Sequence, residues 1–199
     1  ISLFMAWLGS YFFGWRTPFS GHPGLTINYL WTIIGMLFMF GVGLIDDVFD
    51  LRALVKLGGQ IIAATIVTFS GVLLSSIHNP FGSGFIEFGW LAYPITIFYL
   101  VAFANIINLI DGLDGLASGI TMISALTIFV FAVLTNRFDA AIISIAIAGA
   151  CIGFLRYNFY PASIFMGDSG ALFLGFSLGI ASLLAVTRAA LFVSLLVPI

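Results

Sequence analysis

Long uncharged runs of apolar residues alternate along this chain with short polar segments. A segment needs about 20 residues to cross the hydrocarbon layer of a bilayer, and in lipid its backbone groups must pair within a helix. We therefore predict membrane-spanning helices at 24–45, 57–77, 89–110, 115–136, 140–155 and 171–187, and partial or further spans at 1–15 and 189–199. The expected fold class is all-α: a polytopic transmembrane helical bundle with about seven to eight spans in this fragment.

The composition agrees with this pattern. Hydrophobic residues make up 62% of the chain and charged residues only 7%, as in polytopic membrane proteins. The connecting segments are too short for a second domain, so 1–199 is expected to be a single integral-membrane domain. The net charge of −2 gives no indication of a nucleic-acid partner. Because the chain has one cysteine, Cys151, no intrachain disulfide can form.

The acidic residues gather in three polar segments. Two predicted spans separate Asp47 from Asp111, and two more separate Asp114 from Asp168. An even number of crossings returns the chain to the same side, so all three segments should lie at one face of the membrane. Positive charge does not identify that face, because three basic residues fall on each side.

The first segment, DDVFD at 46–50, places two carboxylates next to each other. On a helix Asp46 and Asp50 would share one face, with Asp47 about 100° away. Adjacent carboxylates repel, so at least one should meet a cation or have a raised pKa. The alternative is a helix end entering water, although acids are unfavourable at a helix C-terminus.

The central segment contains two amides followed by two carboxylates. Asn105 and Asn108 are three residues apart, on neighbouring positions of one helix face. With Asp111 and Asp114 they offer the oxygen ligands that Mg²⁺ prefers. Carboxylates at a bilayer helix are usually functional, but helix caps in a loop are the alternative.

The last segment, MGDSG at 166–170, is predicted to open a helix. Asp168 is either the N-cap of that helix or part of an anion site at its N-terminus. Lys56 and Arg156 on the same face can hold phosphate or extend to the membrane interface, and we favour Lys56 because it follows DDVFD closely. Clustered carboxylates with basic groups at a membrane face favour metal-dependent chemistry on a phosphorylated substrate, with a lipid as one reactant.

Three segments together resemble the signature motifs of a known family. DDVFD at 46–50, NIINLIDGLDGLASG at 105–119 and NFYPASIFMGDSG at 158–170 are similar to motifs of the polyprenyl-phosphate N-acetylhexosamine-1-phosphate transferases, glycosyltransferase family 4, in the same order. The resemblance implies transfer of a sugar 1-phosphate from a UDP-N-acetylhexosamine to undecaprenyl phosphate with release of UMP. It also implies Mg²⁺, with Mn²⁺ as a substitute, in a bacterial inner-membrane protein whose active site faces the cytoplasm. A homodimer is a further expectation.

The resemblance also implies roles for individual residues. Asp46 and Asp47 would serve the lipid phosphate, and Asp111 and Asp114 would line the nucleotide pocket. The expected sites are catalytic residues Asp46, Asp47 and Asp111; substrate-binding residues Lys56, Asn105, Asp114 and Asp50; and metal ligands Asp168 and Asn108. We favour direct attack by the lipid phosphate, which is already a competent oxyanion, over a covalent Asp intermediate.

One position favours a branch of this family. The muramoyl-pentapeptide branch typically carries Lys where this chain has Asp50, so we expect UDP-GlcNAc or a related sugar, as in the initiation of teichoic acid or lipopolysaccharide O-antigen. The family's first span and its His-rich loop, which follows a segment like 197–199, are not in this sequence, so the donor sugar stays open.

Three other membrane activities are alternatives for clustered carboxylates in such a chain. A cation-coupled transporter would prefer carboxylates near mid-membrane, whereas these lie at span ends. An intramembrane aspartyl protease needs two Asp residues in adjacent spans, and MGDSG at 166–170 is only faintly similar to its motif. The motif of a CDP-alcohol phosphotransferase begins like DGLDG at 111–115, but Ser118-Gly119 stands where Ala-Arg would be expected, and the later pair of Asp residues is absent.

Overall fold

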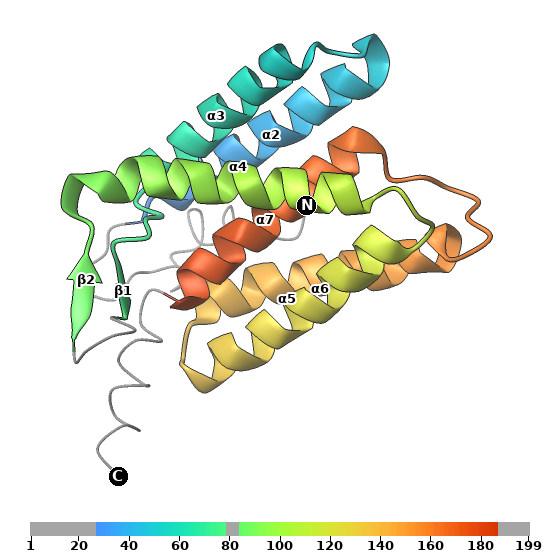
Figure 1. Ribbon diagram of the computed structural model, residues 1–199. Coiled ribbons are helices and arrows are strands. Elements are labelled where there is room, and N and C mark those ends of the chain that lie inside the picture. Colours follow the sequence, from blue (N-terminus) through green and yellow to red (C-terminus); the bar gives the residue numbers. More distant parts are fainter. Residues whose placement is uncertain (1–26, 79–83, 187–199) are drawn as a thin grey trace, which may run out of the picture.

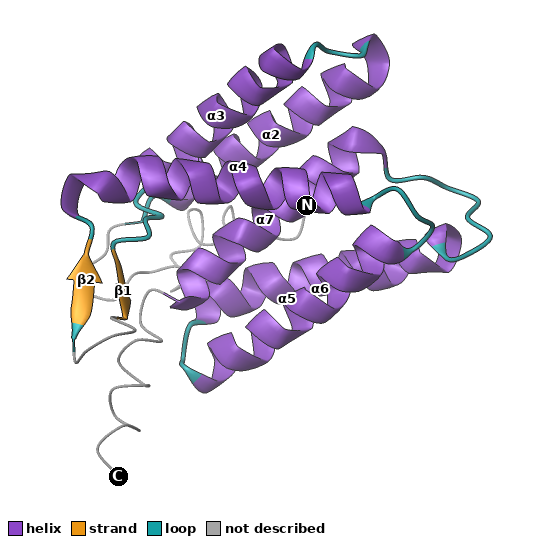
Figure 2. Ribbon diagram, viewed as in Figure 1, coloured by secondary structure: helices purple, strands orange, loops and turns teal. Residues whose placement is uncertain are grey.

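The structure is a computed structural model that describes residues 27–78 and 84–186 (Figure 1). The predicted spans at 1–15 and 189–199 lie outside these ranges. Within them, helices predominate and one small two-stranded sheet is present (Figure 2). The helices are α2 (Tyr29–Phe49), α3 (Ala53–Phe69), α4 (Ala92–Ile110), α5 (Leu116–Leu134), α6 (Phe138–Asn158) and α7 (Gly167–Val186), with a short 3-10 turn η1 (Gly89–Leu91) before α4.

Five helical segments are long and apolar enough to cross a membrane. They are Tyr29–Phe49, Gly89–Ile110, Leu116–Leu134, Phe138–Asn158 and Gly167–Ala185. Helix α3 is also apolar but has only 17 residues. The prediction of an all-α, multi-pass membrane bundle is confirmed.

Several helix ends differ from the predicted spans, because polar residues at a helix end still pair their backbone groups with the preceding turn. Helix α2 continues through Asp46 and Asp47, and α7 begins before Asp168. Helix α3 begins at Ala53, which puts Lys56 in its first turn, and it ends at Phe69 rather than 77. These shifts place Asp46, Asp47 and Asp168 in helix ends, whereas Asp111 and Asp114 lie in the turn between α4 and α5.

A β-hairpin connects α3 to α4. Strands β1 (Ser76–His78) and β2 (Phe85–Glu87) are antiparallel, with Ile77 opposite Ile86. The hairpin begins at Ser76, so residues 76 and 77 lie in a strand and not in the predicted span 57–77. Figure 1 shows the hairpin and the α5–α6 turn at one end of the bundle, and the α2–α3, α4–α5 and α6–α7 connections at the other. The prediction that the three acidic segments share one face is confirmed.

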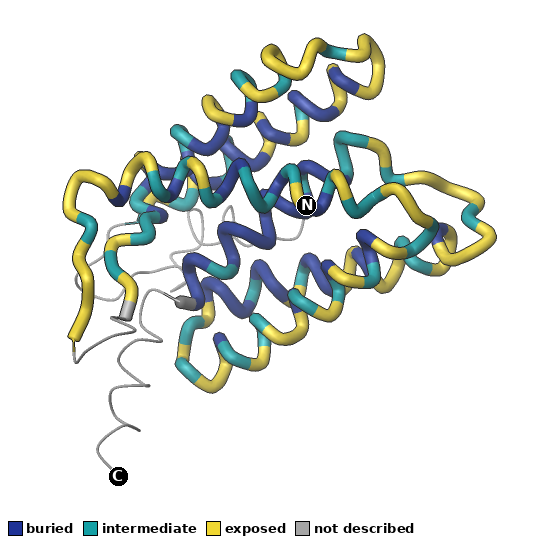
Figure 3. Tube along the Cα trace, in the orientation of Figure 1, coloured by how far each residue is buried: buried dark blue, intermediate teal, exposed yellow. Residues whose placement is uncertain are grey.

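Helix α7 is the centre of the bundle. It packs against α2, α4, α5 and α6, and most of its residues are buried (Figure 3). Its close approach to α4 depends on Gly175, because a Cβ there would lie 2.5 Å from the Phe103 carbonyl oxygen. Outward-facing apolar side chains such as Leu37 and Phe98 are exposed, as expected of helices surrounded by lipid.

Candidate active site

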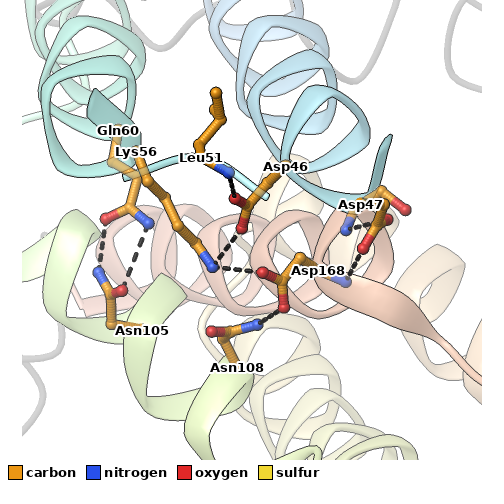
Figure 4. A network of polar contacts seen from close by, with 9 residues as sticks. Asp46, Asp47, Leu51, Lys56, Gln60, Asn105, Asn108 and Asp168 are labelled. Atoms are coloured by element: carbon orange, nitrogen blue, oxygen red, sulfur yellow. Dashed lines mark hydrogen bonds and ion pairs between the residues drawn. The ribbon is translucent and has the colours of Figure 1, made fainter. Parts of the chain in front are cut away.

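Asp168 is the point where three helices meet. It is the second residue of α7, and its Oδ1 accepts a hydrogen bond from Asn108 Nδ2 of α4 at 2.6 Å. Its Oδ2 forms an ion pair with Lys56 Nζ of α3 (Figure 4). The carboxylate therefore joins α3, α4 and α7 at the acidic end of the bundle.

Lys56 bridges two carboxylates. Besides Asp168, its Nζ lies 2.7 Å from Oδ2 of Asp46 in α2. Asp46 is 7% exposed, and its Oδ1 accepts the backbone N–H of Leu51 at 2.9 Å. A buried carboxylate needs such compensation, because an unpaired charge in this environment is costly. The prediction that one of the adjacent carboxylates meets a cation is confirmed for Asp46.

Asp47 points to a different partner. Its Oδ1 accepts the backbone N–H of Asp168 at 2.7 Å, and its Oδ2 accepts that of Ser169 at 3.0 Å. These are the second and third N–H groups of α7, which an N-cap side chain normally satisfies. The alternative in which Asp168 is the N-cap of its own helix is therefore wrong, because Asp168 is the second residue of α7. A carboxylate from α2 does so and also complements the positive end of the helix dipole.

Two glycines allow this contact. A Cβ at Gly43 of α2 would lie 2.5 Å from Ser169 Cα and 2.7 Å from the Asp168 carbonyl oxygen, so only glycine fits between α2 and the start of α7. Gly167 has a φ of +66°, in the left-handed region that favours glycine. A Cβ there would also lie 2.9 Å from Asp47 Oδ2.

A pocket of about 260 Å³ opens beside Asp168. Asn108, Asp111 and Asp114 from the α4–α5 region line one side, and Phe165 to Asp168 line the other. Burial, and secondly the negative charge of Asp168, raise the pKa of Asp111 to about 6. The ionised form of Asp111 is thus less stable in the pocket than in water.

The loop between α6 and α7 is held to the α4–α5 turn by two residues. Asp114 Oδ2 accepts the Ala162 N–H at 3.0 Å. Asn158, 3% exposed, accepts from Gly115 N–H at 3.1 Å and from Ser118 Oγ at 3.0 Å, and its Nδ2 donates to the Ile164 carbonyl oxygen at 3.0 Å. Asn158 is the first residue of one of the three motifs but was not among the predicted site residues. The signal that could have identified it is its position at the same end of the bundle as the acidic segments.

A second residue missed from the sequence is Gln60. It is almost fully buried in α3, four residues after Lys56, and its carboxamide exchanges two hydrogen bonds with that of Asn105 (Figure 4). The signal was a single amide within an otherwise apolar run. Asn105 also donates to the Val101 carbonyl oxygen at 2.8 Å, so its side chain faces α3 rather than the pocket.

Asp50, which was selected, and Arg156, over which Lys56 was favoured, do not join the cluster. Asp50 is exposed and lies beyond the end of α2 with a φ of 47°. The prediction that Asp46 and Asp50 share a helix face is wrong, because the helix ends at Phe49. Arg156 is exposed at the end of α6. His78 is in β1, at the other end of the bundle, and His22 lies outside the described residues.

The residues of the pocket fit a magnesium ion. Across 27–78 and 84–186, no group of three or more His, Cys, Asp or Glu side chains is close enough to hold a metal by itself. Mg²⁺ is commonly bound by one or two carboxylates together with water and substrate phosphates. Each oxygen of Asp168 accepts one N–H, which leaves further lone pairs for a cation. A cation would also stabilise the ionised form of Asp111, whose pKa is raised by burial and by the charge of Asp168.

The family model of glycosyl transferase family 4 matches residues 29–186. A probable undecaprenyl-phosphate N-acetylglucosaminyl 1-phosphate transferase of Bacillus subtilis is 40% identical over 166 residues, which are 83% of this chain and 46% of the relative. A decaprenyl-phosphate N-acetylglucosaminephosphotransferase of Mycolicibacterium smegmatis is 41% identical over 80% of this chain and 43% of its own. A phospho-N-acetylmuramoyl-pentapeptide-transferase of Caldicellulosiruptor bescii is 40% identical over 69% of this chain and 46% of the relative. The chain thus spans about half the length of the curated relatives it matches.

Proposed function

The chain belongs to glycosyl transferase family 4, and from this premise we propose that the complete protein transfers an N-acetylhexosamine 1-phosphate from a UDP-sugar to undecaprenyl phosphate. GlcNAc 1-phosphate is the proposed group, in agreement with the names of the relatives from Bacillus subtilis and Mycolicibacterium smegmatis. The products are the lipid-linked sugar diphosphate and UMP. The reaction would initiate a cell-envelope polysaccharide or teichoic acid.

One observation carries the proposal. Asp168, Lys56 and Asn108 come from three helices that are far apart in sequence, yet they meet at one end of the bundle, beside an acidic pocket that Asp168 and Asn108 line. A site that combines a lysine with carboxylate and amide oxygens suits a diphosphate accompanied by a cation. Its location at a helix end suits a reactant whose other part is in the bilayer.

The proposed reaction is a direct displacement. An oxygen of the lipid phosphate attacks the phosphorus that carries the sugar, a new P–O bond forms, and the bond from that phosphorus to the bridging oxygen breaks as UMP leaves. The lipid phosphate is already ionised near neutral pH, so no residue has to remove a proton from it. This agrees with Asp46 and Asp47, whose oxygens are all engaged in hydrogen bonds or an ion pair.

The chain's own residues would therefore bind and orient the reactants. Asp46 holds Lys56, and we propose that Lys56 contacts phosphate. Asp47 fixes the start of α7, and so the position of Asp168. Asp111 and Asp114 would line the nucleotide side of the pocket.

Asp168 and Asn108 are the proposed ligands of Mg²⁺, with Mn²⁺ as a substitute. When bound, the ion would neutralise the diphosphate and let an anionic phosphate approach it. In the absence of a cation, the carboxylates of the pocket would repel both reactants.

We further propose that the acidic end faces the cytoplasm of a bacterial inner membrane, where a nucleotide sugar is available, and that the protein is a homodimer. A cation-coupled transporter is the alternative. The arrangement favours it less, because the clustered carboxylates lie at the first or last turns of helices rather than along a path through the middle of the bundle.

Release of UMP by the complete protein in detergent tests the proposal. Turnover of UDP-GlcNAc should require both undecaprenyl phosphate and Mg²⁺, and Asp168→Asn should abolish it without lowering the yield of folded protein. The matched control is Glu87→Gln, which removes an exposed carboxylate in the hairpin at the other end of the bundle and should keep the wild-type rate. Robust turnover by Asp168→Asn would remove Asp168 from the metal site, and wild-type turnover without the lipid phosphate would refute the acceptor.

A further inference from the structure

Gln60 is a buried polar residue that the reaction described above does not use. Its side chain is 1% exposed within an apolar helix, where a carboxamide without partners would be costly. Asn105 Nδ2 donates to Gln60 Oε1 at 2.6 Å, and Gln60 Nε2 donates to Asn105 Oδ1 at 3.3 Å. Within the described part of the chain, these two bonds are the only side-chain hydrogen bonds directly between α3 and α4.

This amide pair lies next to the Asp168 cluster. Helices α3 and α4 run in opposite directions, and Gln60 follows Lys56 by one turn while Asn105 precedes Asn108 by about one turn. The two helices therefore meet in two successive layers about 4.5–6 Å apart along the helix axis. In the outer layer Lys56 and Asn108 both reach Asp168, and in the inner layer Gln60 and Asn105 bind each other (Figure 4).

We propose that Gln60 is a positioning residue for the transfer reaction, an inference that rests on the proposed function. By pairing with Asn105 it fixes the rotation and height of α4 relative to α3. That register decides whether Asn108 and Lys56 reach the same carboxylate. Gln60 acts through α4 and touches neither reactant, and the Asn105 amide is engaged in this pairing rather than in substrate contact.

The pair can be tested by exchanging its members in the complete protein. Gln60→Asn shortens the pair by one methylene, Asn105→Gln lengthens it by one, and the double exchange restores the combined length. Each single variant should lower kcat by about tenfold or more, as expected when a buried hydrogen bond is broken, while KM for the nucleotide sugar changes by less than about twofold. Both single variants should need more Mg²⁺ for half-maximal rate, and the double variant should recover most of the rate and the Mg²⁺ dependence.

Tyr99→Phe is the matched control. It removes a half-buried hydrogen bond of 2.8 Å between Tyr99 of α4 and Ser182 of α7, at a point about 13 Å along α4 from Asn108. A loss of helix packing alone would affect this variant and the Gln60 variants alike. We expect Tyr99→Phe to keep the wild-type Mg²⁺ dependence.

A second measurement does not depend on turnover. Thermal unfolding of the wild type, both single variants and the double variant, without substrates and with or without Mg²⁺, forms a double-mutant cycle. The inference predicts that the double variant is more stable than the sum of the single effects allows, and that Mg²⁺ raises Tm less in the single variants than in the other two proteins.

The outcomes separate the two proposals. If the wild type turns over no UDP-sugar, the proposed function fails, and the unfolding cycle with Mg²⁺ decides the role of Gln60 by itself. Single variants with wild-type Mg²⁺ dependence, or a double variant whose defects are simply additive, would overturn the inference. Equal loss of Mg²⁺ response in Tyr99→Phe would also overturn it.

Discussion

Replacing Asp47 with Asn should loosen the first turn of α7. In the native protein the two carboxylate oxygens accept the N–H groups of Asp168 and Ser169 at 2.7 and 3.0 Å. Asparagine keeps one acceptor oxygen but places an NH₂ group beside the second N–H. It also removes a negative charge from the positive end of the helix dipole.

The size of the effect follows from these two losses. Loss of one of the two hydrogen bonds to the Asp47 carboxylate costs about 0.5–2 kcal/mol, and loss of a charge at a helix end costs about 0.3–1 kcal/mol. Together they lower the free energy of opening this turn by about 1–3 kcal/mol, which corresponds to an increase of roughly 5- to 150-fold in the open population.

Hydrogen–deuterium exchange of the complete protein in detergent measures that population directly. Peptides that cover 167–172 should exchange faster in Asp47→Asn by the factor above, while the middle of α7 keeps its protection. The control is Asp50→Asn, which removes an equal charge three residues later from an exposed side chain, at a φ of 47° that Asn tolerates. It should leave α7 unchanged.

Unchanged exchange at the start of α7 in Asp47→Asn would refute the capping role. Faster exchange in all helices would refute the local reasoning as well, because it would mean that Asp47 stabilises the bundle as a whole.

Two further predictions concern the pocket and the helix contact. Because the pKa of Asp111 is raised to about 6 by burial and by Asp168, its protonated form stabilises the cation-free protein at low pH, and this contribution is lost as pH rises through about 6. Mg²⁺ affinity, measured by calorimetry, should weaken as pH falls from 7 to 5, because protonation removes the negative charge of Asp111. Asp111→Asn should abolish this pH dependence of the affinity, and a pH dependence that persists in the variant would assign it to another group. Gly43→Ala should lower Tm and should reduce the rate of UMP release about tenfold or more. The new Cβ would lie 2.5 Å from Ser169 Cα, and overpacking of a core costs about 1–3 kcal/mol. Gly41→Ala, with no atom within 4 Å of its Cβ, should be neutral in both assays, and equal effects of the two variants would contradict the close contact.

Counting spans was enough to predict which polar segments meet. Span length is fixed by bilayer thickness, so an even number of crossings between Asp47, Asp111 and Asp168 implies one common face, and the bundle confirms it. The exact helix ends were not accessible in this way. A helix continues through polar residues as long as its backbone groups pair, which is why α2 contains Asp46 and Asp47 and stops before Asp50.

The partners of the individual side chains could not be predicted. Asp46 and Asp47 are neighbours in sequence, yet one faces Lys56 and the other faces the start of α7. That choice depends on how closely α2 approaches α7, which Gly43 decides through packing. Gln60 was missed for a related reason: a single amide in an apolar run has no periodic signal, and its meaning appears only when α4 lies beside it.

The position of α7 in the order of the chain has a consequence for biogenesis. The Asp168 carboxylate is the partner of Lys56 and Asn108, and the backbone N–H groups of Asp168 and Ser169 are the partners of Asp47. Both residues are synthesised after these three partners. While the ribosome is still producing α6, the charged side chains of α2 and α3 are already present but their partners on α7 are not. Insertion of α7 therefore supplies the partners of these three residues in one step, and a chain that stops before α7 lacks all of these contacts.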